Sequence, residues 1–294
     1  SEMCIRDRPW RKTRDPYKVM VSEIMLQQTQ VDRVLPKYRA FLEQFPTLEA
    51  LAAAPVAEVI RAWAGLGYNR RAVNMQRTAR VVVQEYAGRF PQDVSELLKL
   101  PGIGAYTAGA IACFAFEQDV VFMDTNIRRV ISRLLYSPEA EPSDRELLQP
   151  MAELLPQGQG WAWNQAIMEL GALICTATSP ACWRCPVREY CSDYAARLQA
   201  DEQSLSYTAV VAKPLKKVAE RRETAYTQSS RYYRGRIIAA LREHQSGLNT
   251  DQLGQLLKED YSPVQQVWVE SLLRGLERDG LLVRLGDMVR LPDD

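Results

Sequence analysis

Four cysteines give the clearest sign of chemistry in this sequence. Cys175, Cys182, Cys185 and Cys191 are spaced as C-x6-C-x2-C-x5-C, and four soft sulfur ligands with no histidine nearby select iron–sulfur or zinc. The unequal outer gaps differ from the paired C-x2-C motifs of zinc ribbons and from bacterial ferredoxin spacing. A loop that binds a metal or a cluster is predicted, and the alternatives are zinc and buried or disulfide-bonded cysteines. Cys113 lies alone in an apolar stretch and is expected to be packed core.

Two carboxylates occupy positions where acid–base chemistry is possible. Glu23 lies in the predicted helical segment 22–30, one turn before a polar cluster, and Asp124 follows an apolar run at a predicted helix start. Taken alone, Glu23 fits a solvated helix residue and Asp124 fits an N-cap. His244 is the only histidine and lies outside this region. Carboxylates must therefore do any acid–base work, since the sequence offers no Ser-His or Cys-His system here.

A glycine-containing turn joins two helical patterns at Leu100–Ala108, with the sequence L-P-G-I-G-A-Y-T-A. Gly102 and Gly104 permit a tight turn that exposes backbone N–H groups. At the start of a helix, such groups bind phosphate oxygens without reading base sequence. The segment matches the helix-hairpin-helix signature, and together with the cysteine loop it indicates a DNA-binding protein.

Helices must position these residues. Apolar residues recur at spacings of three and four throughout residues 17–194. Turn signals such as Phe45–Thr47 and Gly65–Gly67 divide this region into many short helices. Almost no alternating strand pattern is found there, so the fold class predicted for residues 9–194 is all-α.

The C-terminal part predicts a small separate domain over residues 231–294. Three helices followed by a two-stranded wing suggest a winged-helix-like α+β domain. Such modules bind DNA or make protein contacts. The basic residues within 231–236, at the start of the domain, slightly favour phosphate binding. The expected elements are helices at Arg234–His244, Thr250–Lys258 and Val264–Arg278, and strands at Leu281–Arg284 and Met288–Leu291.

The rest of the chain sets limits on location and partners. Residues 1–8 resemble a translated sequencing adaptor, so the native sequence is expected to begin near Pro9, and the polar residues 195–230 suit a linker. The net charge is only +1 over 294 residues, so a DNA footprint needs local clusters of Lys and Arg. No apolar run approaches the roughly 20 residues that span a bilayer, and no signal peptide opens the chain. A soluble, intracellular protein in a reducing compartment is expected.

Together these motifs resemble the MutY-type adenine DNA glycosylases, a branch of the helix-hairpin-helix, 4Fe-4S base-excision superfamily related to endonuclease III. The resemblance covers roughly Pro9–Cys191 and includes Pro9-Trp10-Arg11, the segment 22–30, the hairpin, Asp124-Thr125-Asn126 and the cysteine spacing. It implies the helix-hairpin-helix DNA glycosylase fold and a 4Fe-4S cluster on the four cysteines. It also implies hydrolysis of the N-glycosidic bond of adenine opposite 8-oxoguanine or guanine in double-stranded DNA, with the adenine flipped out of the duplex.

The resemblance implies roles for single residues. Glu23 would protonate the adenine at N7 from an apolar pocket that raises its pKa, and Asp124 would stay ionised beside the oxocarbenium-like sugar. Asn126 would position water or the sugar. Tyr106 replaces the lysine of bifunctional relatives, and a phenol cannot form a Schiff base, which implies a monofunctional enzyme. The residues implied at the DNA are Trp10, Arg11 and Gln165 around the adenine, Gln28 and Tyr68 as wedges in the base stack, and Thr29 near the opposite base.

Two features depart from the commoner pattern of the family. Asn69 stands where many members carry a second aromatic residue, and Asp124-Thr125-Asn126 replaces Asp-Gly-Asn, as in a branch known from high-GC bacteria. The C-terminal half also shows no sign of the nucleotide-hydrolase-like domain that inspects 8-oxoguanine in well-known members.

Two other functions fit parts of this pattern. One is a thymine or uracil mismatch glycosylase on the same scaffold, which Glu23 argues against because a pyrimidine leaving group needs less protonation. The other is a catalytically inactive iron–sulfur DNA-binding protein. Ordinary helix packing is the alternative for Tyr68 and Gln165. The expected protein is a bacterial, cytoplasmic monomer, associated with the nucleoid through DNA, whose cluster loop meets phosphates through Arg184 and Arg188. The partner of its C-terminal domain stays open.

Overall fold

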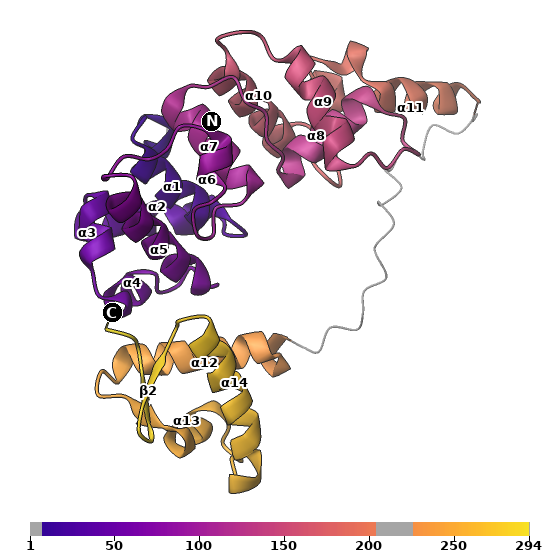
Figure 1. The fold of residues 1–294 in the computed structure, drawn as a ribbon. Helices are drawn as coiled ribbons and strands as arrows, with labels where there is room; N and C mark the ends of the chain where they lie inside the picture. Colours follow the sequence, from indigo (N-terminus) through magenta and orange to yellow (C-terminus); the bar gives the residue numbers. More distant parts are fainter. Residues whose placement is uncertain (1–7, 204–225, 294) are drawn as a thin grey trace. The chain divides into compact units, whose positions relative to one another are not determined.

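The computed structural model describes residues 8–203 and 226–293, and helices dominate it (Figure 1). The chain forms two compact units, neither of which is continuous in sequence. Within the described ranges, no helix is both long enough and apolar enough to span a membrane. The first unit consists of Ser1–Val19, Gln92–Leu98 and Gly104–Ala219, and the second of Met20–Pro91, Lys99–Ile103 and Glu220–Asp294.

Helices α8 and α10 pack together at the centre of the first unit. Asp124 caps α8 by accepting the backbone N–H of Ile127 at 2.6 Å. Gly171 lets α10 approach closely, because a Cβ there would lie 2.9 Å from Cβ of Asn126. The elements of this unit are η2 (Pro9–Arg11), α6 (Val94–Leu97), α7 (Ala105–Phe116), α8 (Thr125–Leu135), α9 (Asp144–Leu154), α10 (Gly160–Leu173), η3 (Cys182–Arg184), η4 (Arg188–Tyr190) and α11 (Ser192–Gln203).

Helix α5 packs against α3 and α4 in the second unit. The buried Gln76 donates from α5 to the carbonyl oxygen of Ala54 at 2.5 Å, at the end of α3. Leu51 and Trp63 are fully buried in the same unit. The elements in this part are α1 (Pro16–Leu26), whose first residues belong to the first unit, α2 (Val31–Gln44), α3 (Leu48–Ala53), α4 (Val56–Ala62) and α5 (Arg70–Glu85).

The C-terminal domain has the winged-helix-like arrangement that the sequence predicts. Its hairpin turns at Gly286, which has φ +59°. A third strand, β1, pairs antiparallel with β3 and gives the sheet order β1-β3-β2. Sequence analysis missed β1 because two residues are too few to show an alternating pattern. The elements are η5 (Tyr226–Gln228), α12 (Ser230–Glu243), β1 (Leu248–Asn249), α13 (Thr250–Leu257), η6 (Pro263–Gln265), α14 (Gln266–Arg278), β2 (Val283–Leu285) and β3 (Met288–Arg290).

The C-terminal domain shares a hydrophobic core with α4 and α5, within the second unit. Ala57 of α4 and Val73 of α5 are buried in the same cluster as Ile238 of α12 and Leu273 of α14. The backbone N–H of Ala57 also donates to the carbonyl oxygen of Pro292 at 2.7 Å. Apolar side chains of both segments are thus removed from water together, which favours association.

The all-α expectation for the N-terminal region is confirmed. The predicted linker at 195–230 begins with helical residues, since α11 continues to Gln203, and residues 204–225 lie outside the described ranges. Residues 1–7 of the predicted adaptor segment also lie outside them.

The turn before α7 depends on one glycine. Gly102 has φ +76°, and a Cβ on it would lie 2.7 Å from Cβ of Asn74. Thr78 Oγ1 donates to the carbonyl oxygen of Pro101 at 2.6 Å and holds the turn on α5. Gly104 is the N-cap of α7, with φ −95° and no atom within 4 Å of a Cβ position. The fold therefore requires glycine at position 102, whereas position 104 has room for a Cβ atom.

Gly102→Ala should lower the free energy of unfolding by about 1–2 kcal/mol, because alanine disfavours the left-handed backbone conformation at this position. Overlap with Asn74 adds to this loss. Gly104→Ala is the matched control and should change the stability much less. Denaturant unfolding of both variants measures the difference, and equal midpoints would contradict the role given to Gly102.

Candidate functional site

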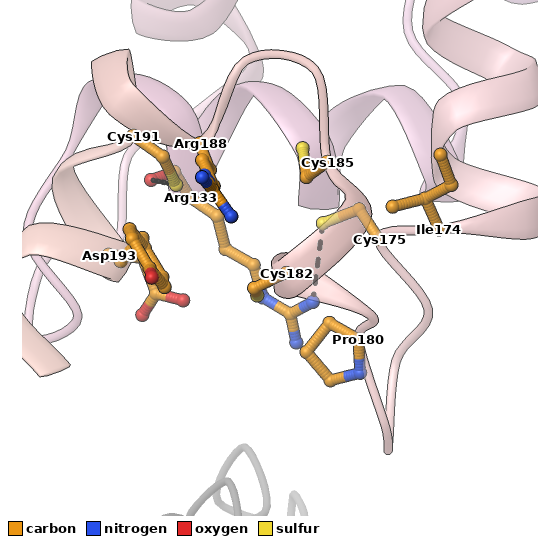
Figure 2. Close-up of a pocket in the computed structure, with 10 residues that line it drawn as sticks. Arg133, Ile174, Cys175, Pro180, Cys182, Cys185, Arg188, Cys191 and Asp193 are labelled. Atoms are coloured by element: carbon orange, nitrogen blue, oxygen red, sulfur yellow. Dashed lines mark hydrogen bonds between the residues drawn. The ribbon is translucent and has the colours of Figure 1, made fainter.

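The four predicted cysteine ligands line one pocket, which confirms that the motif closes on itself. Cys175 follows α10, Cys182 begins η3, Cys185 follows η3, and Cys191 follows η4. Figure 2 shows their side chains around the same space, with Arg133 reaching into it from α8. Each of these cysteines is a free thiol, so the disulfide alternative is wrong.

The donor set suits a 4Fe-4S cluster, because four cysteine sulfurs line one pocket and such clusters are held by four thiolates. Arg133 Nη1 donates to Cys175 Sγ at 3.4 Å, and Arg188 lines the same pocket, so cations face the sulfurs. When bound, the cluster supplies covalent links that hold residues 175–191 as one loop.

Burial shapes the acidity of these thiols. It raises the pKa of Cys182, an effect that Arg197 opposes. It also raises the pKa of Cys191, where the backbone N–H of Tyr194 opposes it. Cluster ligands are thiolates, so the neighbouring donors and cations favour the ligating form. Outside the loop, Cys113 is fully buried and burial raises its pKa to about 12, which confirms the prediction of packed core.

A chain of polar contacts joins the start of α8 to the cysteine loop. Asn126 Nδ2 donates to Asp124 Oδ2 at 3.3 Å, and Arg129 Nη2 donates to Asn126 Oδ1 at 2.8 Å. The same guanidinium donates to the carbonyl oxygens of Cys175 at 2.8 Å and Gly171 at 2.7 Å. The structure thus brings Asp124 and Asn126 together and connects both with the first cysteine.

Tyr106 and Arg11 lie at the two ends of a row of aromatic rings in the first unit. The ring of Tyr106 meets that of Phe122 edge-on, with 5.4 Å between centroids, and Phe122 meets Phe114 in the same way at 5.5 Å. The guanidinium of Arg11 lies 5.0 Å from the centroid of Phe114. Trp10 precedes Arg11 in η2, and both side chains are buried. Two predicted site residues, Arg11 and Tyr106, therefore share one aromatic region, and Trp10 adjoins Arg11 in sequence.

Gln165 is buried in α10 with an unusual side-chain amide. Only 2% of Gln165 is exposed, and neither Oε1 nor Nε2 has a hydrogen-bond partner among the described residues. The neighbouring Asn164 is buried too, but its Nδ2 donates to the carbonyl oxygens of Val120 at 2.9 Å and Gly160 at 2.8 Å. Because buried amides normally have partners, Gln165 fits a ligand-binding amide better than ordinary helix packing.

Glu23 is buried on α1 in the second unit. It is 2% exposed, between Ser22 at 1% and Ile24 at 4%. The alternative of a solvated helix residue is therefore wrong.

Arg71 joins the two loops that carry the predicted wedge residues. On one side, its guanidinium donates to the carbonyl oxygens of Ile24 at 2.7 Å and Gln27 at 2.6 Å. On the other side, it donates to those of Leu66 at 3.1 Å and Gly67 at 3.3 Å. One partly buried cation thus fixes the end of α1 against the loop before α5.

The predicted wedge residues lie on either side of this cation. Gln28 and Tyr68 have left-handed backbones, with φ +53° and +46°, a conformation that most side chains disfavour. Thr29 Oγ1 accepts from Arg71 at 3.4 Å, and the Arg71 guanidinium lies 5.5 Å from the Tyr68 ring. Burial lowers the pKa of Arg71 to about 10, an effect that Tyr68 opposes. The structure therefore brings Gln28, Thr29 and Tyr68 together around Arg71.

Sequence analysis missed the roles of Arg71 and Arg129. Arg71 follows Tyr68 by three residues and Arg129 follows Asn126 by three, which is about one helical turn. A long cationic side chain one turn after a motif residue at a helix start is the signal that could have revealed both.

Comparison with known families defines the class of this protein. Residues 21–157 match the HhH-GPD superfamily of base excision DNA repair proteins, and residues 175–191 match the iron-sulfur binding domain of endonuclease III. The second match begins and ends at the outer cysteines. The fold and the loop are those of a helix-hairpin-helix base-excision protein with a 4Fe-4S cluster.

Comparison with individual proteins narrows this class. The adenine DNA glycosylase of Mycolicibacterium smegmatis is 39% identical over 284 residues, which cover 96% of this chain and 89% of that protein. The Mycobacterium tuberculosis adenine DNA glycosylase is 38% identical and covers 81% of this chain and 74% of its own length. The human one is 41% identical over 68% of this chain, but over only 38% of its own length. This chain belongs to the adenine DNA glycosylase family.

Solved structures show the same scaffold with other chemistry. A thermostable thymine-DNA glycosylase matches with a TM-score of 0.61 and 33% identity, over 65% of this chain and 89% of that one. A trapped endonuclease III–DNA covalent intermediate matches with a TM-score of 0.56 and 25% identity, over 62% and 86%.

Arg129→Ala should lower the free energy of unfolding by about 1–3 kcal/mol, because it leaves two partly buried carbonyl groups without their charged donor. Arg128→Ala is the matched control. Arg128 forms an exposed ion pair with Asp144, which should contribute only about 0–1 kcal/mol. Thermal unfolding, followed both by circular dichroism and by iron–sulfur absorbance, compares the two. An equally stable Arg129→Ala protein would contradict the link between α8 and the loop.

Proposed function

We propose that this chain hydrolyses the N-glycosidic bond of adenine mispaired with 8-oxoguanine or guanine in double-stranded DNA. The burial of Glu23 on α1 carries this proposal, in a chain 39% identical to an adenine DNA glycosylase. Adenine leaves poorly as an anion, and protonation at N7 by a positioned acid lowers the barrier. A buried carboxyl group stays protonated more readily than an exposed one, so Glu23 is the acid.

Asp124 is the anion that stabilises the sugar. One of its oxygens already accepts the N–H of Ile127 and the other the amide of Asn126, so its direction is fixed before substrate binds. A fixed carboxylate favours the positive charge that develops on the sugar as the base departs. Asn126, held by Arg129, positions water or the sugar beside it.

Several other residues are assigned to DNA binding. The unpartnered amide of Gln165 and the buried Trp10 and Arg11 take the extruded adenine, because base chemistry requires the base to leave the stack. The backbone N–H groups that follow Gly104 at the start of α7 bind a phosphate. Gln28 and Tyr68 enter the base stack, and Thr29 lies near the opposite base.

Tyr106 makes the enzyme monofunctional. Its ring packs on Phe122, and a phenol offers no amine for a Schiff base with the sugar. Water therefore completes the reaction and leaves an abasic site in an intact strand.

The second candidate is thymine excision. The 33% identity to the thymine-DNA glycosylase favours it, and Tyr106 and Asp124 are compatible with it. A buried carboxyl at Glu23 favours adenine, since a pyrimidine leaving group needs less protonation.

Single-turnover base release decides between these candidates. Matched duplexes would carry A opposite 8-oxoguanine, A opposite G, T opposite G and U opposite G. We expect adenine release only, with no strand cleavage before alkali treatment. Release of thymine or uracil without adenine would replace the proposal with the mismatch function.

Glu23→Gln should lower the rate of adenine release by about 10²–10⁴-fold, the usual contribution of a general acid. Asp124→Asn should lower it by about 10²–10³-fold through lost charge stabilisation. Because Asn caps helices as well as Asp does, Asp124→Asn should keep its stability. Glu43→Gln, at an exposed glutamate of α2, is the control and should react like the wild type. Unchanged rates of adenine release in the first two variants would place the reaction at another site.

The cluster loop is assigned to the phosphate backbone. Arg184 and Arg188 each use one N–H for a carbonyl oxygen of Leu173 or Trp183, and Trp183 is 76% exposed. Arg184→Ala should flatten the plot of log affinity for duplex DNA against log salt by about one unit. A slope equal to that of the wild type would remove Arg184 from the interface.

A further inference from the structure

The C-terminal domain reaches the loop that carries Tyr68. Arg242 of α12 donates through Nη2 to Asn69 Oδ1 at 2.8 Å and through Nε to the carbonyl oxygen of Ile60 at 3.1 Å. Burial lowers the pKa of Arg242, so this contact is largely shielded from water. Asn69, which stands where many family members carry a second aromatic residue, is thus the anchor of the C-terminal domain on this loop.

A second link joins the following residue to the same domain. Arg70 Nη1 lies 3.5 Å from Asp279 Oδ1, and Arg234 of α12 binds the other oxygen of Asp279. With the shared hydrophobic core, these contacts fix the start of α12 beside residues 67–70.

Arg231, at the start of α12, lies on the ring of Tyr68. Its guanidinium carbon is 4.1 Å from the ring centroid, a close cation–π contact. Tyr68 remains 40% exposed and Arg231 is exposed. Tyr226, 62% exposed, has its ring centroid 5.8 Å from the same guanidinium. Arg231 and these two exposed rings are here called the Tyr68–Arg231 surface.

The cations of the wing are engaged elsewhere. Arg284 pairs with Glu270 at 2.9 Å and Glu277 at 3.3 Å, and Arg290 pairs with Asp293 at 2.7 Å. Paired charges attract phosphates weakly. The two wing arginines are therefore less suited to phosphate binding than Arg231.

We propose that Arg231 is a DNA-contact residue that orients Tyr68 and binds a phosphate next to it, so that the C-terminal domain is part of the DNA interface. This inference rests on the proposed function in taking duplex DNA as the ligand. Exposed rings stack on bases, and a guanidinium binds phosphate oxygens with two N–H groups. The Arg231 guanidinium lies over the ring of Tyr68, which restricts the directions that this ring can take.

The test uses the full-length, cluster-containing protein with Arg231→Ala, Arg231→Lys and the control Arg274→Ala. Arg274 is an exposed cation of the same domain that contacts the carbonyl oxygen of Glu270. Binding to a duplex with tetrahydrofuran opposite guanine is measured over a salt series. Arg231→Ala should flatten the salt slope by about one unit, whereas Arg231→Lys and Arg274→Ala should keep it. A salt slope and an affinity for Arg231→Ala equal to those of Arg274→Ala would overturn the proposal. That result would instead favour a protein as the partner of this surface.

A double-mutant cycle with Tyr68→Ala tests the positioning role. If Arg231 acts through Tyr68, the losses of affinity in the two single variants should not add up in the double variant. Strictly additive losses would overturn the positioning role. Because the readout is binding, a wild-type protein that binds this duplex but releases no adenine would disprove the proposed reaction without touching the inference on Arg231.

Discussion

The planar guanidinium of Arg129 is the constraint on which the first unit depends. It donates in fixed directions to the carbonyl oxygens of Gly171 and Cys175 and to the amide of Asn126. The end of α10, the first residue of the cysteine loop and the polar start of α8 are therefore held by one group. The iron–sulfur loop therefore helps to position the groups around the carboxylate of Asp124. A shift of the loop would move Arg129, which is the donor that orients Asn126.

Arg71 has a comparable role in the second unit. It satisfies carbonyl groups that the end of α1 and the loop before α5 leave without helical partners. Gln28 and Tyr68 hold left-handed backbones on either side of it. Residues in such conformations persist only where surrounding contacts fix them. In both units, a partly buried arginine that takes no part in proton transfer holds in place the residues assigned to catalysis or to DNA binding.

The C-terminal domain extends this second arrangement. Its helices bury apolar residues against α4 and α5, its arginines reach Asn69 and Tyr68, and Arg70 pairs with its Asp279. In the sequence, Asn69 looks like a weakened motif because an aromatic residue is expected at this position. In the structure, its side chain accepts a hydrogen bond from Arg242.

The sequence by itself determined what is encoded locally: the helical periodicity, the Gly102 turn, the Cys175–Cys191 loop and the order of the C-terminal helices and hairpin. Capping, turn chemistry and ligand spacing act over a few residues, so one chain suffices to recognise them. Only the tertiary structure decided the burial of Glu23, the strand β1 and the contact of Arg231 with Tyr68. These depend on packing between segments far apart in sequence, and neither periodicity nor spacing records which distant side chain will cover a given group.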